Sequence, residues 1–389
     1  MVELGVNASP VIIASLMRLE GTTGLQTHMR EFESFLKDRG LPYEVATPFY
    51  SSGAPALHVF VALRWVLEVI CKPAAVWLYR AGHAFLLRLR LARLMAKYPR
   101  CVVYAQCPLS ASVALRCVRS PEQLVSLVVH FNLSQADEWI DKGAIAADGP
   151  MARSIRRLDQ AVLPRLHSLV YVSRFMQEEL PLRVSRLQSV RSAVIPNFVK
   201  ALSSDNVMPA LRGRDLVSIG TLEHRKNQQF LLRVVALAKS SGRVVTLTLV
   251  GDGPDRKTLE ALAAELGIAD QVFFAGFCAG ARAYVPGHKL YVHAAIMENQ
   301  GLALIEALSA GVPILAGGVG GIVEVFDEGV EGRFWPLDDA ARACDVLLDV
   351  LERPGALEQM GQAATRRFQA RFEASVVGQK LYDFLLGKS

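Results

Sequence analysis

The stretch from His293 to Val325, HAAIMENQGLALIEALSAGVPILAGGVGGIVEV, gives the clearest indication of the fold. A polar loop, ENQG, leads into the apolar run LALIEALSAG, which ends at Gly311 and is followed by Pro313. This order predicts a loop, a short helix and then a buried strand. The chain is therefore expected to be an α/β protein.

Two carboxylates in this stretch, Glu298 and Glu306, are separated by seven residues. Glu298 precedes the helix, and Glu306 lies about one and a half turns inside it. Carboxylates accept hydrogen bonds from hydroxyl groups, so they suit a sugar ring or a ribose. Gly301 allows close approach of the backbone, and the helix that starts there offers free N–H groups to a phosphate. The alternative is a chance pair of glutamates beside an ordinary glycine loop.

These residues resemble the signature of the retaining family 4 glycosyltransferases (glycosyl transferases group 1, polysaccharide-biosynthesis type) of the GT-B fold. The signature is a glutamate, seven residues and a second glutamate, then a small-residue helix and a GG-x-x-E turn, here Gly320, Gly321 and Glu324. The resemblance implies two Rossmann-like α/β domains that face each other across a cleft, with a final helix that crosses back to the first domain. The predicted divisions are an acceptor-binding domain (1–198), a linker (199–212), a nucleotide-sugar-binding domain (213–368) and the crossover helix (369–389).

Length and composition indicate how many domains the chain can form and which compartment suits it. Its 389 residues, 51% of them hydrophobic, are enough for two full cores. The six cysteines are scattered without metal-ligand spacing, which indicates a reducing compartment and no zinc. The amino terminus lacks the pattern of a signal peptide, so a cytoplasmic location is expected.

Positive charge is concentrated in the first half of the chain. Residues 1–200 hold 24 Lys and Arg against 15 Asp and Glu, and no acidic residue occurs between Val69 and Pro121. Residues 54–100 combine this charge with apolar side chains, a pattern typical of a helix lying on an anionic membrane surface, here the inner face of the cell membrane. The segment is too interrupted by charges to span a bilayer. A solvated basic helix is an alternative, and nucleic acid is disfavoured as a partner because no reader motif accompanies the charge.

The first domain contributes two candidate site residues. The opening segment reads as a strand, a glycine-containing loop and a helix, and His130 follows a buried strand at the edge where α/β sheets bind ligands. By the resemblance, Gly24 stands in the loop where donor phosphate and acceptor meet, although the family's adjacent glycine pair is reduced here to Gly24 beside Thr23. The resemblance places His130 near the donor sugar and the segment after it on the acceptor side.

The second domain contributes the remaining candidates. Arg225 and Lys226 lie between a strand and a helix and suit a diphosphate leaving group. In the family an arginine stands where this chain has Thr221, so Arg225 is the candidate substitute. The resemblance assigns Glu298 to the sugar hydroxyls, Glu306 to the ribose, and Phe277 and Cys278 to the nucleobase. The other predicted donor-binding residues are Gly220, Asn299, Gln300, Gly301 and Leu302.

The resemblance implies transfer of a hexose or related sugar, with retention, from a nucleotide-diphosphate sugar. UDP is favoured and GDP is possible. The acceptor is expected to be a lipid-linked molecule or a saccharide in bacterial surface or exopolysaccharide biosynthesis. No Asp-x-Asp pair occurs, so neither a metal nor another cofactor is expected. The alternatives are a non-catalytic scaffold of the same fold at the membrane, and a nucleotide-sugar epimerase.

Overall fold

The computed structural model describes residues 9–21, 23–49, 63–131, 134–202 and 214–388. The chain divides into two compact units. One unit comprises Met1–Ile195 with Gly378–Ser389, and the other comprises Pro196–Val377. Most of the predicted linker (199–212), from 203 to 212, lies outside the described residues.

The first unit is built on a six-stranded parallel sheet of order β2-β1-β3-β4-β5-β6. Its four inner strands are buried runs with many β-branched residues, as parallel strands covered on both faces are, whereas its two edge strands are only partly buried. The strands are β1 (Val11–Ala14), β2 (Tyr43–Ala46), β3 (Cys101–Ala105), β4 (Gln123–Val129), β5 (Ser168–Tyr171) and β6 (Arg191–Val194).

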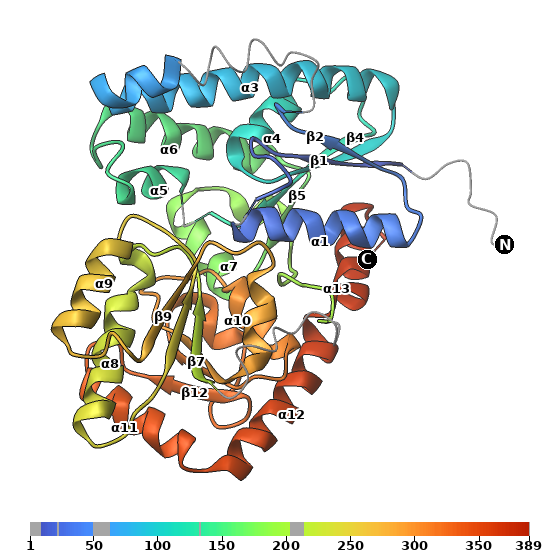
Figure 1. Cartoon of the computed structure of the whole chain (residues 1–389). Coiled ribbons are helices and arrows are strands. Elements are labelled where there is room, and N and C mark those ends of the chain that lie inside the picture. Colours follow the sequence, from blue (N-terminus) through green and yellow to red (C-terminus); the bar gives the residue numbers. More distant parts are fainter. Residues whose placement is uncertain (1–8, 22, 50–62, 132–133, 203–213, 389) are drawn as a thin grey trace. The chain divides into compact units, whose positions relative to one another are not determined.

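Helices cover both faces of this first sheet (Figure 1). They are α1 (Gly24–Asp38), α3 (Lys72–Lys97), α4 (Pro108–Leu115), α5 (Gln135–Asp141), α6 (Pro150–Val162) and α7 (Arg174–Arg183). Leu87 of α3 packs in the same apolar cluster as Val103 of β3. Phe32 of α1 contacts the next residue of that strand, Tyr104, with ring centroids 5.5 Å apart. Because successive side chains of a strand point to opposite faces, α1 and α3 cover opposite sides of the sheet.

The second unit contains another six-stranded parallel sheet, of order β12-β11-β10-β7-β8-β9. Its strands are β7 (Arg214–Ile219), β8 (Leu247–Val250), β9 (Val272–Gly276), β10 (His288–His293), β11 (Ile314–Gly317) and β12 (Gly332–Trp335). Its helices are α8 (Gln228–Ser240), α9 (Arg256–Glu265), α10 (Leu302–Ser309), α11 (Ala340–Leu351) and α12 (Pro354–Arg371). The two sheets confirm the predicted α/β class with two Rossmann-like units.

The path of the chain through each sheet reverses once. In the second sheet β7, β8 and β9 run outward in order, and the chain then returns to place β10 on the other side of β7. The first sheet reverses in the same way between β1 and β3. Ligands of open α/β sheets bind beyond the carboxyl ends of the strands at such a reversal. A ligand of the second unit is therefore expected at the loops after β7 and β10.

The predicted loop, helix and strand around Gly301 are confirmed. The helix α10 begins after Gly301, whose φ is +78°, and ends before Gly311, whose φ is +66°. The strand β11 follows directly. Both glycines adopt a left-handed conformation that L side chains rarely take, which explains why the helix has these limits.

The basic segment is helical where it is described, over residues 63–70 and along α3. Many of its large apolar side chains are exposed, among them Trp65 (76%), Val69 (85%), Ile70 (74%), Trp77 (60%) and Phe85 (56%). Arg88 and Arg93 are also exposed, whereas Arg90 pairs with Glu44 of β2 at 3.4 Å. None of the described helices is long and apolar enough to cross a membrane. Residues 54–62 of the predicted segment lie outside the described residues.

The last helix, α13 (Ala374–Leu385), packs against α1 through a glycine. A Cβ added at Gly378 would lie 2.6 Å from the ring of Phe35, which is 3% exposed.

We expect Gly378→Ala to lower the free energy of unfolding by about 1–3 kcal/mol, because the ring has no room to move. Gly355→Ala is the matched control, since Gly355 is a helical glycine with open space around it. It should leave the chain as stable or up to about 1 kcal/mol more stable. Equal urea midpoints for the two variants would contradict this packing.

Candidate functional site

The loops that follow β7 and β10 meet at one edge of the second sheet. The two strands are neighbours, with Leu290 paired to Leu216 and Tyr291 to Val217. Beyond the strands, the N–H of Ile296 donates to the carbonyl oxygen of Arg225 at 3.0 Å. This bond joins the loop that carries Arg225 and Lys226 to the loop that carries Glu298.

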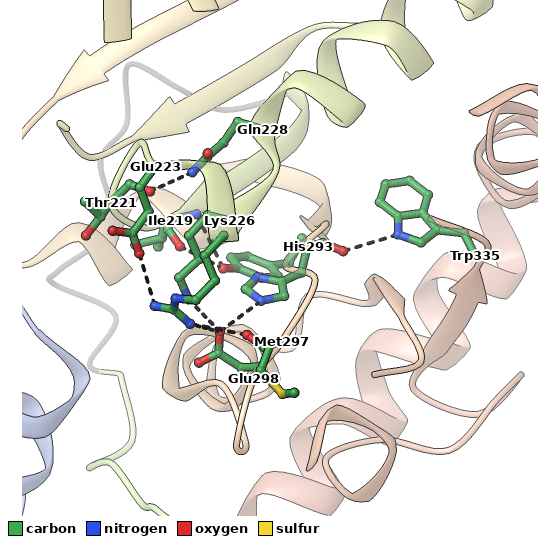
Figure 2. Close-up of polar contacts among 11 residues, drawn as sticks. Ile219, Thr221, Glu223, Lys226, Gln228, His293, Met297, Glu298 and Trp335 are labelled. Carbon is green, nitrogen blue, oxygen red and sulfur yellow. Dashed lines mark hydrogen bonds and ion pairs between the residues drawn. The ribbon is translucent and has the colours of Figure 1, made fainter. Parts of the chain in front are cut away.

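Glu298 is the centre of a cluster of charged groups (Figure 2). Its Oε2 accepts a hydrogen bond from Lys226 Nζ at 2.6 Å. Arg225 Nη1 and His293 Nε2 lie 3.6 Å and 3.7 Å from the same oxygen. Three of the predicted site residues, Glu298, Arg225 and Lys226, are thus brought together.

The two cations are held in place by further contacts. Arg225 donates from Nη1 to the carbonyl oxygen of Met297 at 3.2 Å and from Nη2 to Glu223 Oε1 at 3.1 Å. The short turn His224–Lys226 carries both cations, and Asn227, with φ +53°, leads from it into α8. The methylene chain of Lys226 passes Gly220, where an added Cβ would lie 3.8 Å from it. The cations are therefore ordered before any ligand arrives, which suits electrostatic stabilisation of a leaving group.

The environment fixes the ionisation of the two central residues. Burial alone would raise the pKa of Glu298, but the charge of Lys226, the contact with His293 and the charge of Arg225 hold that pKa well below its usual range. Burial lowers the pKa of His293, and its contact with Glu298 offsets this only in part. Glu298 is accordingly a carboxylate and His293 is neutral at pH 7.

The start of α10 lies directly after this cluster. A Cβ added at Gly301 would lie 2.7 Å from Leu304 Cδ1 and 3.3 Å from Glu298 Cγ, so only glycine fits there without a shift. The helix that begins at Leu302 directs N–H groups and a positive dipole end outward from this point. An anion beside Glu298 would therefore find backbone donors as well as the two cations.

The neighbouring predicted residues have different surroundings. Gln300 is buried and accepts a hydrogen bond at Oε1 from the N–H of Asn197 at 2.6 Å, so its amide also anchors the chain within this unit. Asn299 is buried beside it. Glu306 is half-buried on α10, and its charge contributes to the raised pKa of Tyr291 after the larger effect of burial. The Tyr291 hydroxyl consequently stays protonated and donates to the carbonyl oxygen of Ile219 at 3.3 Å.

The turn GDGP at 251–254 supports the loop after β7 through its glycines. A Cβ added at Gly251 would lie 2.0 Å from the carbonyl oxygen of Gly220, and one at Gly253 would lie 2.3 Å from that of Leu222. The N–H of Leu222 donates to the carbonyl oxygen of Asp252 at 3.1 Å. Both glycines are thus required by close packing of two backbones, which positions the segment leading to Arg225 and Lys226.

Phe277 and Cys278 follow β9 in the same unit. Phe277 is 59% exposed. Cys278 is half-buried, with Sγ 3.2 Å from the hydroxyl of Tyr284. The exposed ring of Phe277 leaves an apolar surface near the end of β9.

The two candidates of the first unit lie near each other. Gly24 is the first residue of α1, which Thr23 caps by accepting from the N–H of Gln26. His130 follows β4, and its ring lies 4.4 Å from that of His28 on α1. Burial, with a smaller contribution from His28, lowers the pKa of His130 well below its usual value, so His130 is neutral at pH 7.

Three residues of these clusters were not predicted from the sequence. His293 is the last residue of the buried strand β10, close to the position that His130 has after β4, and the same rule would have selected it. Glu223 shares the predicted cationic turn but carries no distinctive pattern. His28 lies one helical turn after Gly24, and its Nε2 is 3.0 Å from the hydroxyl of Tyr104. Within the described parts of the chain, no group of three or more His, Cys, Asp or Glu side chains is placed to hold a metal ion.

Two family models match the chain. "Glycosyltransferase Family 4" matches residues 22–201, and "Glycosyl transferases group 1" matches residues 209–367. Together they extend over both units, which agrees with the predicted resemblance.

Curated relatives align with part of the chain. A 2-deoxystreptamine glucosyltransferase of Streptomyces kanamyceticus is 31% identical over 136 residues, which are 34% of this chain and 35% of that protein. A GDP-mannose-dependent alpha-(1-6)-phosphatidylinositol monomannoside mannosyltransferase of Mycobacterium tuberculosis is 31% identical over 185 residues, 44% of this chain and 47% of that protein. The chain thus matches less than half the length of each of these relatives.

Solved structures align over nearly the whole chain. The crystal structure of Anabaena HepE in complex with UDP and glucose has a TM-score of 0.70 at 17% identity, and the match covers 98% of this chain and 100% of that one. A sucrose-phosphate synthase from Thermosynechococcus elongatus also has a TM-score of 0.70, at 18% identity, with 98% and 100% covered. At this identity the likeness establishes the fold alone.

The ionised state of Glu298 predicts a pH dependence of stability. Its folded pKa is depressed, so the unfolded chain binds more protons between that pKa and the usual glutamate pKa of about 4.3. The contribution of Glu298 is complete above this window and is lost as the pH falls through it. We expect Glu298→Gln to cost at least about 1 kcal/mol more at pH 6 than at pH 3, measured by urea unfolding.

The matched control is Glu260→Gln, which removes a carboxylate from an exposed pair with Arg256 on α9. It should change the free energy of unfolding by less than about 0.5 kcal/mol at either pH. Parallel pH profiles for wild type and Glu298→Gln would contradict the strong pairing of Glu298.

Proposed function

The chain belongs to the family 4 glycosyltransferases of the GT-B fold, and from that premise we propose that it transfers a sugar from a nucleotide-diphosphate donor with retention at the anomeric carbon. The observation that supports this best is the cluster of Glu298 with Lys226 and Arg225 beside the start of α10. It combines an acceptor for sugar hydroxyls, cations for a diphosphate and backbone N–H donors at the reversal of one sheet. A hydroxyl-rich, doubly phosphorylated donor requires these three kinds of group.

In the proposed reaction, Glu298 binds sugar hydroxyls while Arg225, Lys226 and the N–H groups of Gly301 and Leu302 bind the diphosphate. Glu306 binds the ribose hydroxyls, and Phe277 and Cys278 lie against the base. His130 and Gly24, which belong to the first unit, contact the donor sugar and its phosphate. As the bond from the anomeric carbon to the diphosphate breaks, the new bond to the acceptor oxygen forms on the same face. The departing phosphate oxygen takes the acceptor's proton, and Arg225 and Lys226 stabilise its charge without a metal.

The donor in this proposal carries a hexose or related sugar on UDP, with GDP as the second possibility. UDP is supported by the HepE complexes, which contain UDP, and GDP by the GDP-mannose-dependent relative. The acceptor is a lipid-linked molecule or a saccharide in bacterial surface or exopolysaccharide biosynthesis. The phosphatidylinositol mannoside named for one relative is a lipid acceptor of this kind.

The proposal places the protein in the cytoplasm, attached to the inner face of the cell membrane through the first unit. The support is the exposed apolar set on residues 63–70 and α3 together with exposed arginines on the same helix. Apolar side chains enter the interface of a bilayer while arginines bind anionic lipid head groups. Arg90 contributes less than the other arginines, because it pairs with Glu44.

Calorimetric binding of UDP, GDP and their sugar conjugates tests the donor site. We expect wild type to bind one of the two nucleotide series, and Glu306→Ala to bind it at least about tenfold more weakly, because two hydrogen bonds from ribose hydroxyls to a carboxylate are lost. Glu260→Ala, which removes an exposed carboxylate of the same unit, is the control and should bind as wild type does. Binding of neither series, or equal binding by Glu306→Ala, would refute the assignment. Transfer that requires added divalent metal would refute the metal-free mechanism.

Sedimentation with anionic vesicles tests the membrane face. We expect the double variant Trp77→Ser with Phe85→Ser to bind at least about tenfold more weakly, because each ring loses on the order of 1–2 kcal/mol of apolar burial. Leu182→Ser is the control, since Leu182 is 79% exposed on α7 of the same unit but lies outside residues 63–97. Equal losses in both variants, or no binding by wild type, would count against attachment through this face.

A further inference from the structure

A pocket lies in the first unit, and none of the residues assigned above to the donor site lines it. Its cavity of about 320 Å³ is enclosed by residues 63–70, the start of α3, and α5 with the loop after it. The charged residues of its lining are Arg64, Glu68, Lys72 and Lys142. This volume is at the small end of ligand sites and suits a head group better than a whole nucleotide sugar.

The charge of the pocket is positive. Three cations and one carboxylate line it, which leaves two net positive charges. Glu68 pairs with Arg64 at 3.5 Å, one turn away on the same helix, and both side chains are partly exposed. Such a pair is worth only about 0.3–0.5 kcal/mol, so Arg64 can turn to an anionic ligand at little cost. Lys72 and Lys142 are exposed at the pocket and are not paired with an acid in any described contact.

Two aromatic rings line the pocket and lie close to two of its cations. Tyr79 and Trp139 lie 5.8 Å apart with their planes at 67°. The guanidinium of Arg64 lies 4.9 Å from the centre of the Tyr79 ring, and Lys142 Nζ lies 5.7 Å from that of Trp139. Rings that support cations in this way hold the charges near the cavity instead of leaving them free in solvent.

The pocket adjoins the exposed apolar side chains of the same helices. Arg64 and Glu68 lie one helical turn apart on residues 63–70, and Lys72, which also lines the pocket, is the first residue of α3. Trp65, Val69 and Ile70, which lie between Arg64 and Lys72 in the sequence, are each 74–85% exposed. A ligand anchored in a bilayer by its acyl or prenyl chain would therefore meet the pocket with its head group while these side chains enter the interface.

We propose that this pocket binds the phosphate group of a membrane lipid whose head group carries about two negative charges, a phosphomonoester or a diphosphate. Two net positive charges match a dianionic phosphate better than the single charge of a phosphodiester lipid. The inference rests on the proposed membrane attachment and not on sugar transfer. It would make the first unit recognise a phosphorylated lipid directly, in addition to general attraction to anionic surfaces.

Vesicle binding by the full chain, without any nucleotide, tests the proposal. The vesicles contain phosphatidylcholine with either phosphatidic acid or phosphatidylglycerol, matched in total negative charge. We expect wild type to bind the phosphatidic acid vesicles at least about fivefold more tightly, and Lys72→Gln with Lys142→Gln to lose this preference. The matched control is Arg88→Gln with Arg93→Gln, which removes the same charge from exposed positions of α3 outside the pocket. It should weaken binding to both vesicles and keep the preference.

The other outcomes of the vesicle experiment each test one part of the proposal. A wild type without preference, or a preference lost equally in both double variants, overturns the pocket and leaves general charge attraction. Loss of the preference in excess inorganic phosphate at constant ionic strength supports the proposal, because the free anion competes for the same phosphate-binding pocket, whereas a preference that excess phosphate leaves unchanged overturns it. Failure to bind any vesicle overturns both this inference and the membrane attachment. Donor binding in the calorimeter is independent of all these results, so failure of the proposed transferase activity would be seen separately.

Discussion

The structure of the second unit's site depends on the placement of the Glu298 carboxylate among Lys226, Arg225 and His293. Removing a carboxylate from water is unfavourable, and the loop can hold it there only because cations from another loop reach the same oxygen. Lys226 does so at 2.6 Å, while neutral His293 contributes no competing charge. The cations in turn need Glu298 and Glu223 as partners. Charge pairing and loop conformation are therefore mutually dependent.

Strand order makes this pairing possible. Glu298 and Lys226 are 72 residues apart and meet because β10 returns to the side of β7. The loops must also approach closely, and glycines at 251 and 253 allow one backbone to lie on another, at distances that a Cβ would block. Gly301 has the same role between Glu298 and α10. The glycines of this region thus allow the loops to approach closely, and this approach brings the charged side chains within reach of one another.

The sequence predicted those features of the fold and site that have local causes, and it did not predict the contacts that depend on strand order. The loop, helix and strand around Gly301 were predicted because glycine conformation and helical spacing act within a few residues. Arg225, Lys226 and Glu298 were selected individually, but their convergence on one oxygen requires the strand order. His293 was missed although its place at the end of a strand could have selected it, but its contact with Glu298 follows only from the fold. Arg90 lies in the segment expected to face a membrane, yet it pairs with Glu44 of β2, a contact across 46 residues that no local pattern indicates.

The charge balance of the cluster bears on how donor binding would proceed in the proposed reaction. Arg225 and Lys226 are matched by Glu223 and Glu298, so the cluster has no excess positive charge to attract a diphosphate. An arriving diphosphate must therefore draw a cation from its carboxylate partner or rely on the N–H groups at the start of α10. When Lys226 turns toward phosphate, Glu298 loses a hydrogen-bond donor at 2.6 Å and needs another. Sugar hydroxyls are donors of this kind, so binding of the phosphate and binding of the sugar would each favour the other. A free nucleoside diphosphate lacks those hydroxyls and would leave Glu298 less well satisfied, which favours the intact donor over the product.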